Sequence, residues 1–224
     1  MLVDFIVGAR PNFMKLSPIY REYCKLDKKK FKIRVIHTGQ HSEHLMSNIF
    51  LKEFKLSKID HFINCKKDNH YDELHSIMIG YQIILNKIKS KPKLIVVFGD
   101  INSTMAISIV AKKNYIKLCH IEGGLRSHDM SMPEEINRMV TDTLSDYFFT
   151  TSEHANKNLI KSGIMKKRIF FVGNTMIDNL INNIDKALLP DFFYSNEIII
   201  NEYLLLTLHR PSNTNDINVL KNIL

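Results

Sequence analysis

Charged side chains follow the end of a short apolar segment near the middle of the chain. Lys117–Ile121 is predicted to be a strand, and the residues after it include Glu122, Arg126, Asp129, Glu134, Glu135 and Arg138. A second predicted strand, Leu94–Phe98, ends in the same way at Gly99 and Asp100. Ligands of open parallel sheets bind beyond the carboxyl ends of the strands, so we expect these groups to face a shared crevice. The alternative for any single acid is that it only caps a helix.

The first predicted strand ends in Gly8-Ala-Arg-Pro-Asn-Phe-Met-Lys15. This is not the Gly-x-Gly-x-x-Gly dinucleotide fingerprint, so nothing here indicates NAD. The segment still lies where a strand passes into a helix, and the free N–H groups of a helix start attract anions. Arg10 and Lys15 add cations at this turn. An anion site and a structural turn both remain open.

The next polar segment is His37-Thr-Gly-Gln-His-Ser-Glu-His44. It lacks the His-Glu-x-x-His pattern of a zinc helix, and Gly39 interrupts any helix here, so we favour a polar lining by Gln40 and His41 over a metal site.

Two further strand ends carry polar residues. After Gly99, we expect Asn102 or Ser103 to cap the following helix, which would leave Asp100 facing the crevice. Tyr203–Leu208 is predicted to be a strand and is followed by His209 and Arg210, for which a ligand contact is the favoured interpretation.

Strands and helices alternate along the whole chain. Apolar residues three or four positions apart predict helices between most strands, as in Ile77-Ile84-Leu85-Ile88 and Met105-Ile109-Val110. Almost continuously apolar strands separated by such helices predict an α/β fold with a doubly wound parallel sheet. The predicted strands are Leu2–Val7, Lys32–Ile36, Leu94–Phe98, Lys117–Ile121, Tyr147–Thr150, Arg168–Val172 and Tyr203–Leu208.

Composition excludes several classes of protein. The 224 residues carry a net charge of +8, but the lysines are scattered in short groups without aromatic neighbours, which argues against nucleic-acid binding. No apolar stretch is long enough for a membrane span, and the first residues enter a strand pattern directly. The three cysteines, Cys24, Cys65 and Cys119, have no metal-type spacing and indicate reduced thiols in a cytosolic protein.

Taken together, the polar segments resemble those of the non-hydrolysing UDP-N-acetylglucosamine 2-epimerases of bacteria. The segments occur in the order of that family and span the chain from end to end. They are Gly8-Ala-Arg-Pro-x-x-x-Lys15, His37-Thr-Gly-Gln-His41, Phe98-Gly-Asp100, His120-Ile-Glu-Gly-Gly-Leu-Arg126, Met132-Pro-Glu-Glu-x-Asn-Arg138, Val172-Gly-Asn174 and Leu208-His-Arg210.

The resemblance implies two facing Rossmann-like domains in the glycosyltransferase-B arrangement, a cytoplasmic homodimer, and no metal or other cofactor. It also implies interconversion of UDP-GlcNAc and UDP-ManNAc, by elimination of UDP to a glycal and its re-addition. The matching positions imply catalytic roles for Asp100, Glu122, Glu134 and His209, and substrate contacts from Arg10, Lys15, Gln40, His41, Arg138 and Arg210.

Members of this family are considerably longer than 224 residues. We therefore expect an N-terminal Rossmann-like domain in residues 1–172, and a linker with the beginning of an incomplete C-terminal domain in residues 173–224. On its own, such a chain is expected to be folded through about residue 172 and to lack turnover.

Three alternatives to this function stay open. The first is a hydrolysing 2-epimerase that releases UDP and ManNAc, although Gly8-Ala-Arg-Pro-Asn12 favours the non-hydrolysing type. The second is a glycosyltransferase of the same architecture. The third is a catalytically inactive fragment that only binds a partner.

Overall fold

The computed structural model describes residues 1–26, 30–40, 56, 58–66, 69–196, 198–208 and 211–224. The chain divides into two units, Met1–Asn182 and Asn183–Leu224. The strands are β1 (Leu2–Val7), β2 (Lys32–His37), β3 (His61–Phe62), β4 (Leu94–Phe98), β5 (Lys117–Ile121), β6 (Tyr147–Thr150) and β7 (Ile169–Phe171). The helices are α1 (Arg10–Lys25), α3 (His70–Lys87), α4 (Asn102–Lys113), α5 (Pro133–Leu144), α6 (Glu153–Lys161), α7 (Thr175–Ile181), α8 (Asp191–Ser195), α9 (Pro211–Thr214) and α10 (Ile217–Ile223).

All seven strands pair in parallel in one sheet of the first unit, in the order β3-β2-β1-β4-β5-β6-β7. The chain winds outward from β1 to β3, returns to the other side of β1, and then winds outward again from β4 to β7. The strand order therefore reverses between β1 and β4, which is where doubly wound sheets bind their ligands. The α/β class with a Rossmann-like, doubly wound parallel sheet is confirmed.

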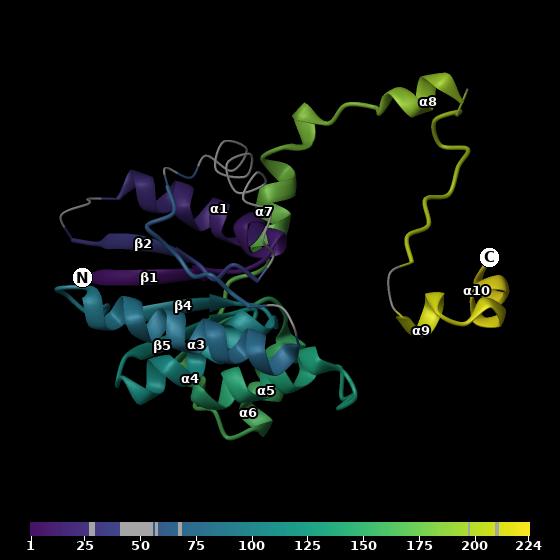
Figure 1. The fold of residues 1–224 in the computed structure, drawn as a ribbon. Helices are drawn as coiled ribbons and strands as arrows, with labels where there is room; N and C mark the ends of the chain where they lie inside the picture. Colours follow the sequence, from purple (N-terminus) through teal and green to yellow (C-terminus); the bar gives the residue numbers. More distant parts are fainter. Residues whose placement is uncertain (27–29, 41–55, 57, 67–68, 197, 209–210) are drawn as a thin grey trace. The chain divides into compact units, whose positions relative to one another are not determined.

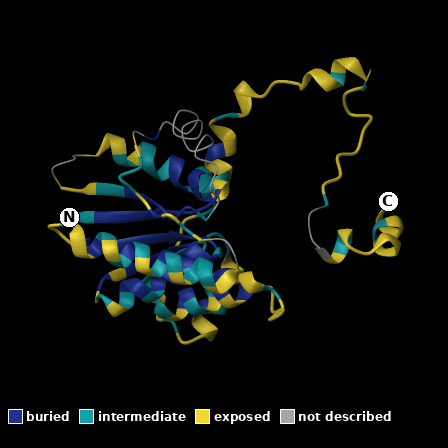
Figure 2. Cartoon of the chain, in the orientation of Figure 1, coloured by how far each residue is buried: buried dark blue, intermediate teal, exposed yellow. Residues whose placement is uncertain are grey.

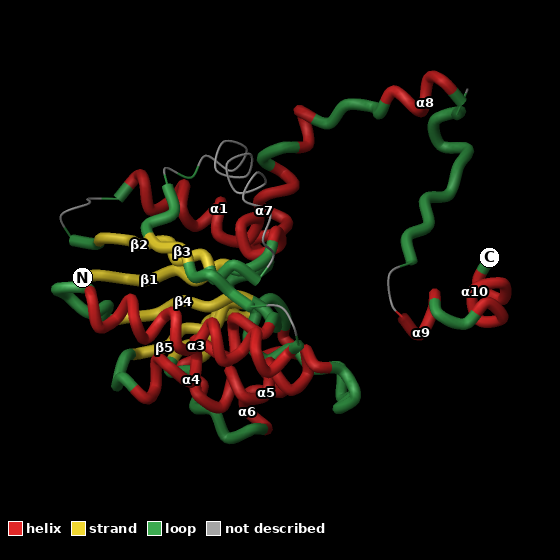
Figure 3. Tube along the Cα trace, in the orientation of Figure 1, coloured by secondary structure: helices red, strands yellow, loops and turns green. Residues whose placement is uncertain are grey.

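Helices cover both faces of this sheet (Figures 1 and 3). In the view of Figure 1, α1 and α7 lie above the strands, and α3, α4 and α5 lie below them. Right-handed crossovers explain this division, because a reversal of winding direction moves the connecting helices to the opposite face.

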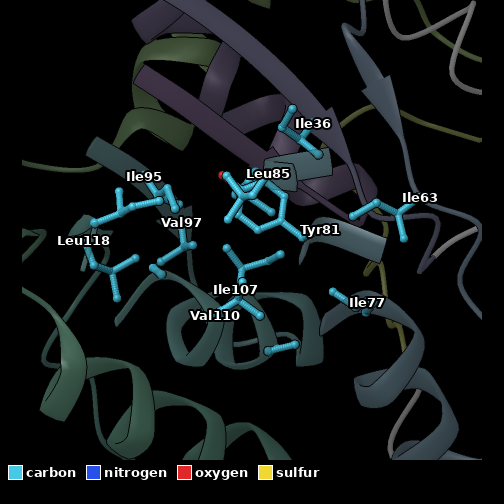
Figure 4. Close-up of a cluster of buried hydrophobic side chains, with 14 residues drawn as sticks. Ile36, Ile63, Ile77, Tyr81, Leu85, Ile95, Val97, Ile107, Val110 and Leu118 are labelled. Atoms are coloured by element: carbon cyan, nitrogen blue, oxygen red, sulfur yellow. The ribbon is translucent and has the colours of Figure 1, made fainter. Parts of the chain in front are cut away.

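Each face of the sheet has its own hydrophobic core, because neighbouring residues of a strand point to opposite faces. In β1, Val3, Phe5 and Val7 pack toward α1, whereas Ile6 packs toward α3 and α4. Figure 4 shows the second cluster, in which Ile95 and Val97 meet Tyr81 and Ile107. The strands are thus fixed from both sides, and their carboxyl ends form a rigid edge.

Helix caps explain where several helices begin. The Asn69 side chain accepts hydrogen bonds from Tyr71 N and Asp72 N, each at 2.9 Å, at the start of α3. The Ser152 hydroxyl accepts one from Ala155 N at 3.2 Å at the start of α6. Such caps satisfy N–H groups that lack partners within the helix.

The second unit, Asn183–Leu224, contains short helices and extended segments. None of its described residues is buried, and Figure 2 shows this unit mostly as exposed. The predicted strand Tyr203–Leu208 was wrong: this segment is extended without strand pairing, and Leu204 is 99% exposed. A strand needs a neighbour for its N–H and C=O groups, and no described residue of this unit supplies one.

Two smaller differences concern the first unit. The strand predicted at Arg168–Val172 is shorter, because Lys166–Arg168 forms a 3-10 turn (η1). The short edge strand β3 was not predicted, since two residues are too few to show an alternating pattern. Among the described residues, no helix is long and apolar enough to cross a membrane.

Candidate active site

Three turns meet at the carboxyl edge of the sheet around the reversal point. They follow β1 at Gly8, β4 at Gly99 and β5 at Glu122. Gly99 has a φ of +62° and Glu122 a φ of +66°, in the left-handed region that non-glycine residues seldom occupy. For a non-glycine residue such as Glu122, this backbone conformation costs free energy, and such residues are often found at functional sites.

Lys15 and Glu122 form the first ion pair at this edge. Lys15 Nζ donates to Glu122 Oε2, and the two side chains are 13% and 11% exposed. The helix that carries Lys15 is fixed at its start, since Asn12 Oδ1 accepts from Gly8 N at 3.0 Å and from Ala9 N at 3.1 Å. A Cβ atom on Gly99 would lie 3.1 Å from Lys15 Nζ and 3.6 Å from Glu122 Oε2. Gly99 therefore lies directly against this pair.

Asp100 and Arg138 form a second ion pair. Arg138 Nη2 lies 2.5 Å from Asp100 Oδ2, and Arg138 Nη1 also donates to Glu135 Oε2 at 2.9 Å. The neighbouring Asn137 donates to the main-chain carbonyl of Asp100 at 2.8 Å. Two successive residues of α5 thus hold both the backbone and the side chain of Asp100.

Glu135 is one of two buried carboxylates of α5, with Asp142. Its oxygens accept from Ser127 N at 2.9 Å, Ser127 Oγ at 3.1 Å and His128 N at 3.3 Å, in addition to Arg138. Burial opposes its charge, but the hydrogen bonds from Ser127, Arg138 and His128 outweigh that cost and hold the pKa of Glu135 below its ordinary value. This residue anchors the loop between β5 and α5 and orients Arg138.

His120 is a fully buried residue of β5. Its Nε2 is 2.8 Å from the Gly99 carbonyl oxygen, and its Nδ1 is 2.7 Å from Asp142 Oδ1. The other Asp142 oxygen accepts from Gly124 N at 3.1 Å and from Arg126 at 2.6 Å. Burial opposes the charge of Asp142, but the hydrogen bond from His120 and the attraction of His120 and Arg126 hold the pKa of Asp142 below its ordinary value.

Gln40 joins the turn after β2 to the start of α4. Its Oε1 accepts from Ser103 N at 3.1 Å and from Ser103 Oγ at 2.6 Å, and Ser103 Oγ lies 2.7 Å from Thr38 Oγ1. A Cβ on Gly8 would lie 2.6 Å from both hydroxyl oxygens, so only glycine fits here. The predicted cap of α4 was wrong. Asn102 and Ser103 lie inside the first turn of α4, and Gln40 supplies the acceptor for the Ser103 N–H group.

The predicted site residues fall into three groups. The structure pairs Lys15 with Glu122 and Asp100 with Arg138, and it bonds Gln40 to Ser103. Arg10 and Glu134 are exposed in the first turns of α1 and α5, so their side chains are accessible at helix starts. The remaining three, His41, His209 and Arg210, lie outside the described residues.

Sequence reasoning missed the supporting residues Asn12, Asn137 and Asp142. A signal was available for Asp142, because it follows Arg138 by four positions and therefore shares its helix face. His120 begins one of the segments that resemble the family, but its contact with Gly99 depends on the pairing of β4 with β5 and could not be predicted.

An apolar groove of ≈ 590 Å³ runs along the α1 face of the sheet and reaches Glu122 at one end. Its walls include Phe5, Val96, Ile121 and Phe149. A charged ligand gains nothing from such walls, so the polar edge around Lys15 and Asp100 is the better candidate for an anionic substrate.

Known proteins are similar to this chain in sequence. A sequence profile described as UDP-N-acetylglucosamine 2-epimerase matches residues 24–224. The chain belongs to the UDP-N-acetylglucosamine 2-epimerase family. A UDP-N-acetylglucosamine 2-epimerase of Methanocaldococcus jannaschii is 39% identical over 226 residues, which cover 100% of this chain and 60% of the relative. A Pseudomonas aeruginosa member, a UDP-2,3-diacetamido-2,3-dideoxy-D-glucuronate 2-epimerase, is 34% identical over 96% of this chain and 59% of its own.

Solved structures of the epimerase family agree with this assignment. One solved structure is that of Methanocaldococcus jannaschii UDP-GlcNAc 2-epimerase in complex with UDP-GlcNAc and UDP. Its TM-score with this chain is 0.85 at 38% identity, and the match covers 100% of this chain and 60% of the epimerase chain. The Neisseria meningitidis enzyme bound to UDP-GlcNAc has a TM-score of 0.75 at 30% identity, over 83% and 50% of the two chains. The chain thus spans about 60% of the length of the first relatives it matches.

Proposed function

We propose that this chain supplies the amino-terminal domain of a cytoplasmic, homodimeric epimerase that interconverts UDP-GlcNAc and UDP-ManNAc. The product would serve as a precursor of surface polysaccharides. The observation that carries the proposal is the convergence of Lys15–Glu122 and Asp100–Arg138 at the reversal point of the sheet. A nucleotide sugar is anionic at its diphosphate and needs proton transfer at its sugar, and this edge offers cations and carboxylates together.

The chemistry of the sugar explains the need for several carboxylates. C2 of the sugar bears a hydrogen and an acylated nitrogen, and C1 is not a carbonyl, so a carbanion at C2 would have no resonance sink. In the proposed route, a base takes the C2 proton, the C1–O bond breaks, and its electron pair leaves with UDP to give a glycal. UDP then adds back to C1 while a proton reaches C2 from the opposite face. No metal or nicotinamide enters these steps.

The proposed roles follow from charge. The carboxylates Asp100, Glu122 and Glu134 exchange protons with the sugar or position it, and His209 completes the catalytic set. Cations neutralise the departing diphosphate, an effect that strengthens as charge develops in the transition state. We assign these substrate contacts to Arg10, Lys15, Gln40, His41, Arg138 and Arg210.

Isotope exchange tests the route directly. The chain is joined to the remaining carboxyl-terminal part of the Methanocaldococcus jannaschii relative, and the fusion is incubated with UDP-GlcNAc in D2O. We expect UDP-ManNAc with deuterium at C2, and movement of an ¹⁸O label out of the position that bridges C1 and phosphorus. Exchange at C2 without C1–O cleavage would contradict elimination, and release of free ManNAc with UDP would establish the hydrolysing alternative.

The fusion needs two controls. The Glu122→Gln variant of the fusion should lose activity, and the unmodified Methanocaldococcus jannaschii relative should turn over under the same conditions. If only the unmodified relative is active while the fusion is folded and does bind UDP, the inactive-fragment alternative is favoured.

A second substrate is favoured by one specific relative. The Pseudomonas aeruginosa member is named for a 2,3-diacetamido uronate and is 34% identical to this chain. Both substrates share the UDP group and the C2 acetamide, so the same elimination applies. Comparing kcat/KM for the two nucleotide sugars in the fusion decides between them.

A further inference from the structure

His120 is a fully buried histidine that contacts Gly99 and Asp142. It is the fourth residue of β5 and pairs in register with Val97 of β4. Both ring nitrogens face oxygen atoms, the Gly99 carbonyl at 2.8 Å and the Asp142 carboxylate at 2.7 Å. A carbonyl oxygen only accepts, so Nε2 carries the hydrogen of the first bond.

Gly99 is hydrogen-bonded to β5 through both its N–H group and its carbonyl oxygen. Its N–H donates to Ile121 O at 3.0 Å, and its carbonyl accepts from His120. The bond to the carbonyl depends on the His120 side chain, whereas the bond from the N–H joins two backbone groups. Gly99 has a φ of +62° and no Cβ atom to restrict its backbone. The two hydrogen bonds to β5 therefore fix its conformation.

Gly99 in turn lies beside three residues of the proposed catalytic edge, Lys15, Glu122 and Asp100. It lies against the Lys15–Glu122 pair, as its hypothetical Cβ 3.1 Å from Lys15 Nζ indicates. Asp100 follows it directly in the chain, and the start of α4 comes next. A shift of the Gly99 peptide would therefore move Asp100 relative to Glu122.

We propose that His120, held by Asp142, is a positioning residue that fixes the Gly99 peptide and thereby the separation of Asp100 from the Lys15–Glu122 pair. The role rests on the proposed function, because the geometry matters for proton transfer to a bound sugar. Buried residues that orient catalytic groups act through preorganisation, and a displacement of about 1 Å can cost about 100-fold in rate.

α5 carries the residues that hold both His120 and Asp100. Asp142 accepts from His120, Gly124 N and Arg126, while Asn137 and Arg138 of the same helix hold Asp100. One rigid helix therefore fixes both Asp100 and, through His120, the peptide before it. This arrangement gives His120 a task that a histidine satisfied within an apolar core would not have.

Two matched variants separate the bonds of His120. The amide nitrogen of glutamine reaches about as far from the backbone as Nε2, so His120→Gln keeps a donor for Gly99. The amide nitrogen of asparagine reaches about as far from the backbone as Nδ1. His120→Asn therefore keeps a donor for Asp142 and loses the hydrogen bond to Gly99. Each variant loses one hydrogen bond, so we expect similar unfolding midpoints for the two.

Activity is measured in the fusion described above. His120→Asn should lower kcat by about 100-fold with KM changed by less than about threefold, whereas His120→Gln should keep kcat within about tenfold of the parent. Equal losses of kcat in the two variants, or losses that follow their unfolding midpoints, would overturn the positioning role.

A second readout needs no activity. In the isotope-labelled 224-residue chain, His120→Asn should shift the NMR signals of the Gly99 and Asp100 amides and of the Glu122 carboxyl carbon, and His120→Gln should leave them close to the parent. If the parent fusion lacks epimerase activity but these shifts occur, the proposed function fails while the structural link stands. Unchanged signals in His120→Asn would refute the link itself, whatever the activity.

Discussion

Two groups of charged residues lie in the same sheet, and they differ in how completely their hydrogen bonds are used. The first is inside the sheet, where Asp4 of β1 faces Arg34 of β2 in register. Arg34 Nε and Nη2 donate to the two Asp4 oxygens at 2.8 Å each, and the Tyr81 hydroxyl donates to Oδ2 at 2.7 Å. Asp4 is fully buried, and both of its oxygens are satisfied.

The second group lies at the carboxyl edge and is only partly satisfied. Among the described residues, the Lys15 ammonium group bonds only to Glu122, and the Glu122 carboxylate uses only its Oε2 atom. The Asp100 carboxylate bonds only to Arg138 among the same residues. Lys15 has three N–H donors and each carboxylate several acceptor positions. A buried ion pair whose hydrogen bonds are saturated helps to specify how strands align. An unsaturated pair at a strand end still has donors and acceptors that can bind a ligand. The carboxylates of the two groups differ in burial, with Asp4 at 0% exposed and Asp100 at 32%, and they differ also in hydrogen-bond saturation.

The largest effect on stability is expected at the saturated group. Asp4→Ala leaves the Arg34 guanidinium without its partner in a nearly solvent-free position, and loss of one member of a buried pair costs about 3–5 kcal/mol. We expect a decrease of that size in the free energy of unfolding, measured with urea. The UDP affinity of the molecules that stay folded should not change. A loss below about 1 kcal/mol would show that Asp4 and Arg34 are not a structural pair.

The matched variant at this group is Tyr81→Phe. Burial and the neighbouring Asp4 carboxylate raise the pKa of Tyr81, so its hydroxyl stays protonated and donates at all ordinary pH values. Its removal takes away one hydrogen bond to a charged group and no charge, so the cost should be smaller, about 1.5–3 kcal/mol.

The opposite pattern is expected at the edge group. Asp100→Asn and Glu122→Gln keep the shape of each side chain and remove a proton acceptor, so each should lower kcat of the fusion by about 100-fold or more, equivalent to about 2.7 kcal/mol of activation free energy. The same prediction applies to Glu134→Gln. Stability should change by only about 1 kcal/mol. Near-normal turnover in all three variants would remove the carboxylates from the proposed site.

A binding measurement sharpens the comparison further. Lys15→Ala and Arg10→Ala should each weaken UDP binding by about 1.5–3 kcal/mol, the range for hydrogen bonds to charged groups. Calorimetric titration of UDP into the fusion measures this, with Lys25→Ala as the control, because Lys25 is exposed at the far end of α1 and pairs only with the nearby Glu22 among the described residues. Equal affinities in all three variants would return Gly8–Lys15 to a purely structural turn.

The same contrast explains what could be predicted from the sequence. Strand ends followed by glycine and a charged residue identified Lys15, Asp100 and Glu122, because parallel strands bring their carboxyl ends to one edge. Asp4 gave no such signal, since its neutralisation by Arg34 depends on the register of β1 with β2. The prediction of a strand at Tyr203–Leu208 was wrong, because a strand needs a neighbour to pair with and local sequence cannot supply one.

The smallest expected change concerns a glycine that supports the edge group. Gly99 and Gly163 both have positive φ, +62° and +84°, so an alanine at either position costs about 1–2 kcal/mol of backbone strain. The surroundings differ: a Cβ on Gly163 meets nothing within 4 Å, whereas a Cβ on Gly99 meets Lys15 Nζ at 3.1 Å. Gly99→Ala and Gly163→Ala should therefore lower the free energy of unfolding by similar amounts, but only Gly99→Ala should also lower kcat of the fusion, by about tenfold, because it displaces Lys15 from Glu122. Equal activities in the two variants, at equal stability, would mean that the Lys15–Glu122 contact tolerates displacement and that the edge group is less finely positioned than its short contacts indicate.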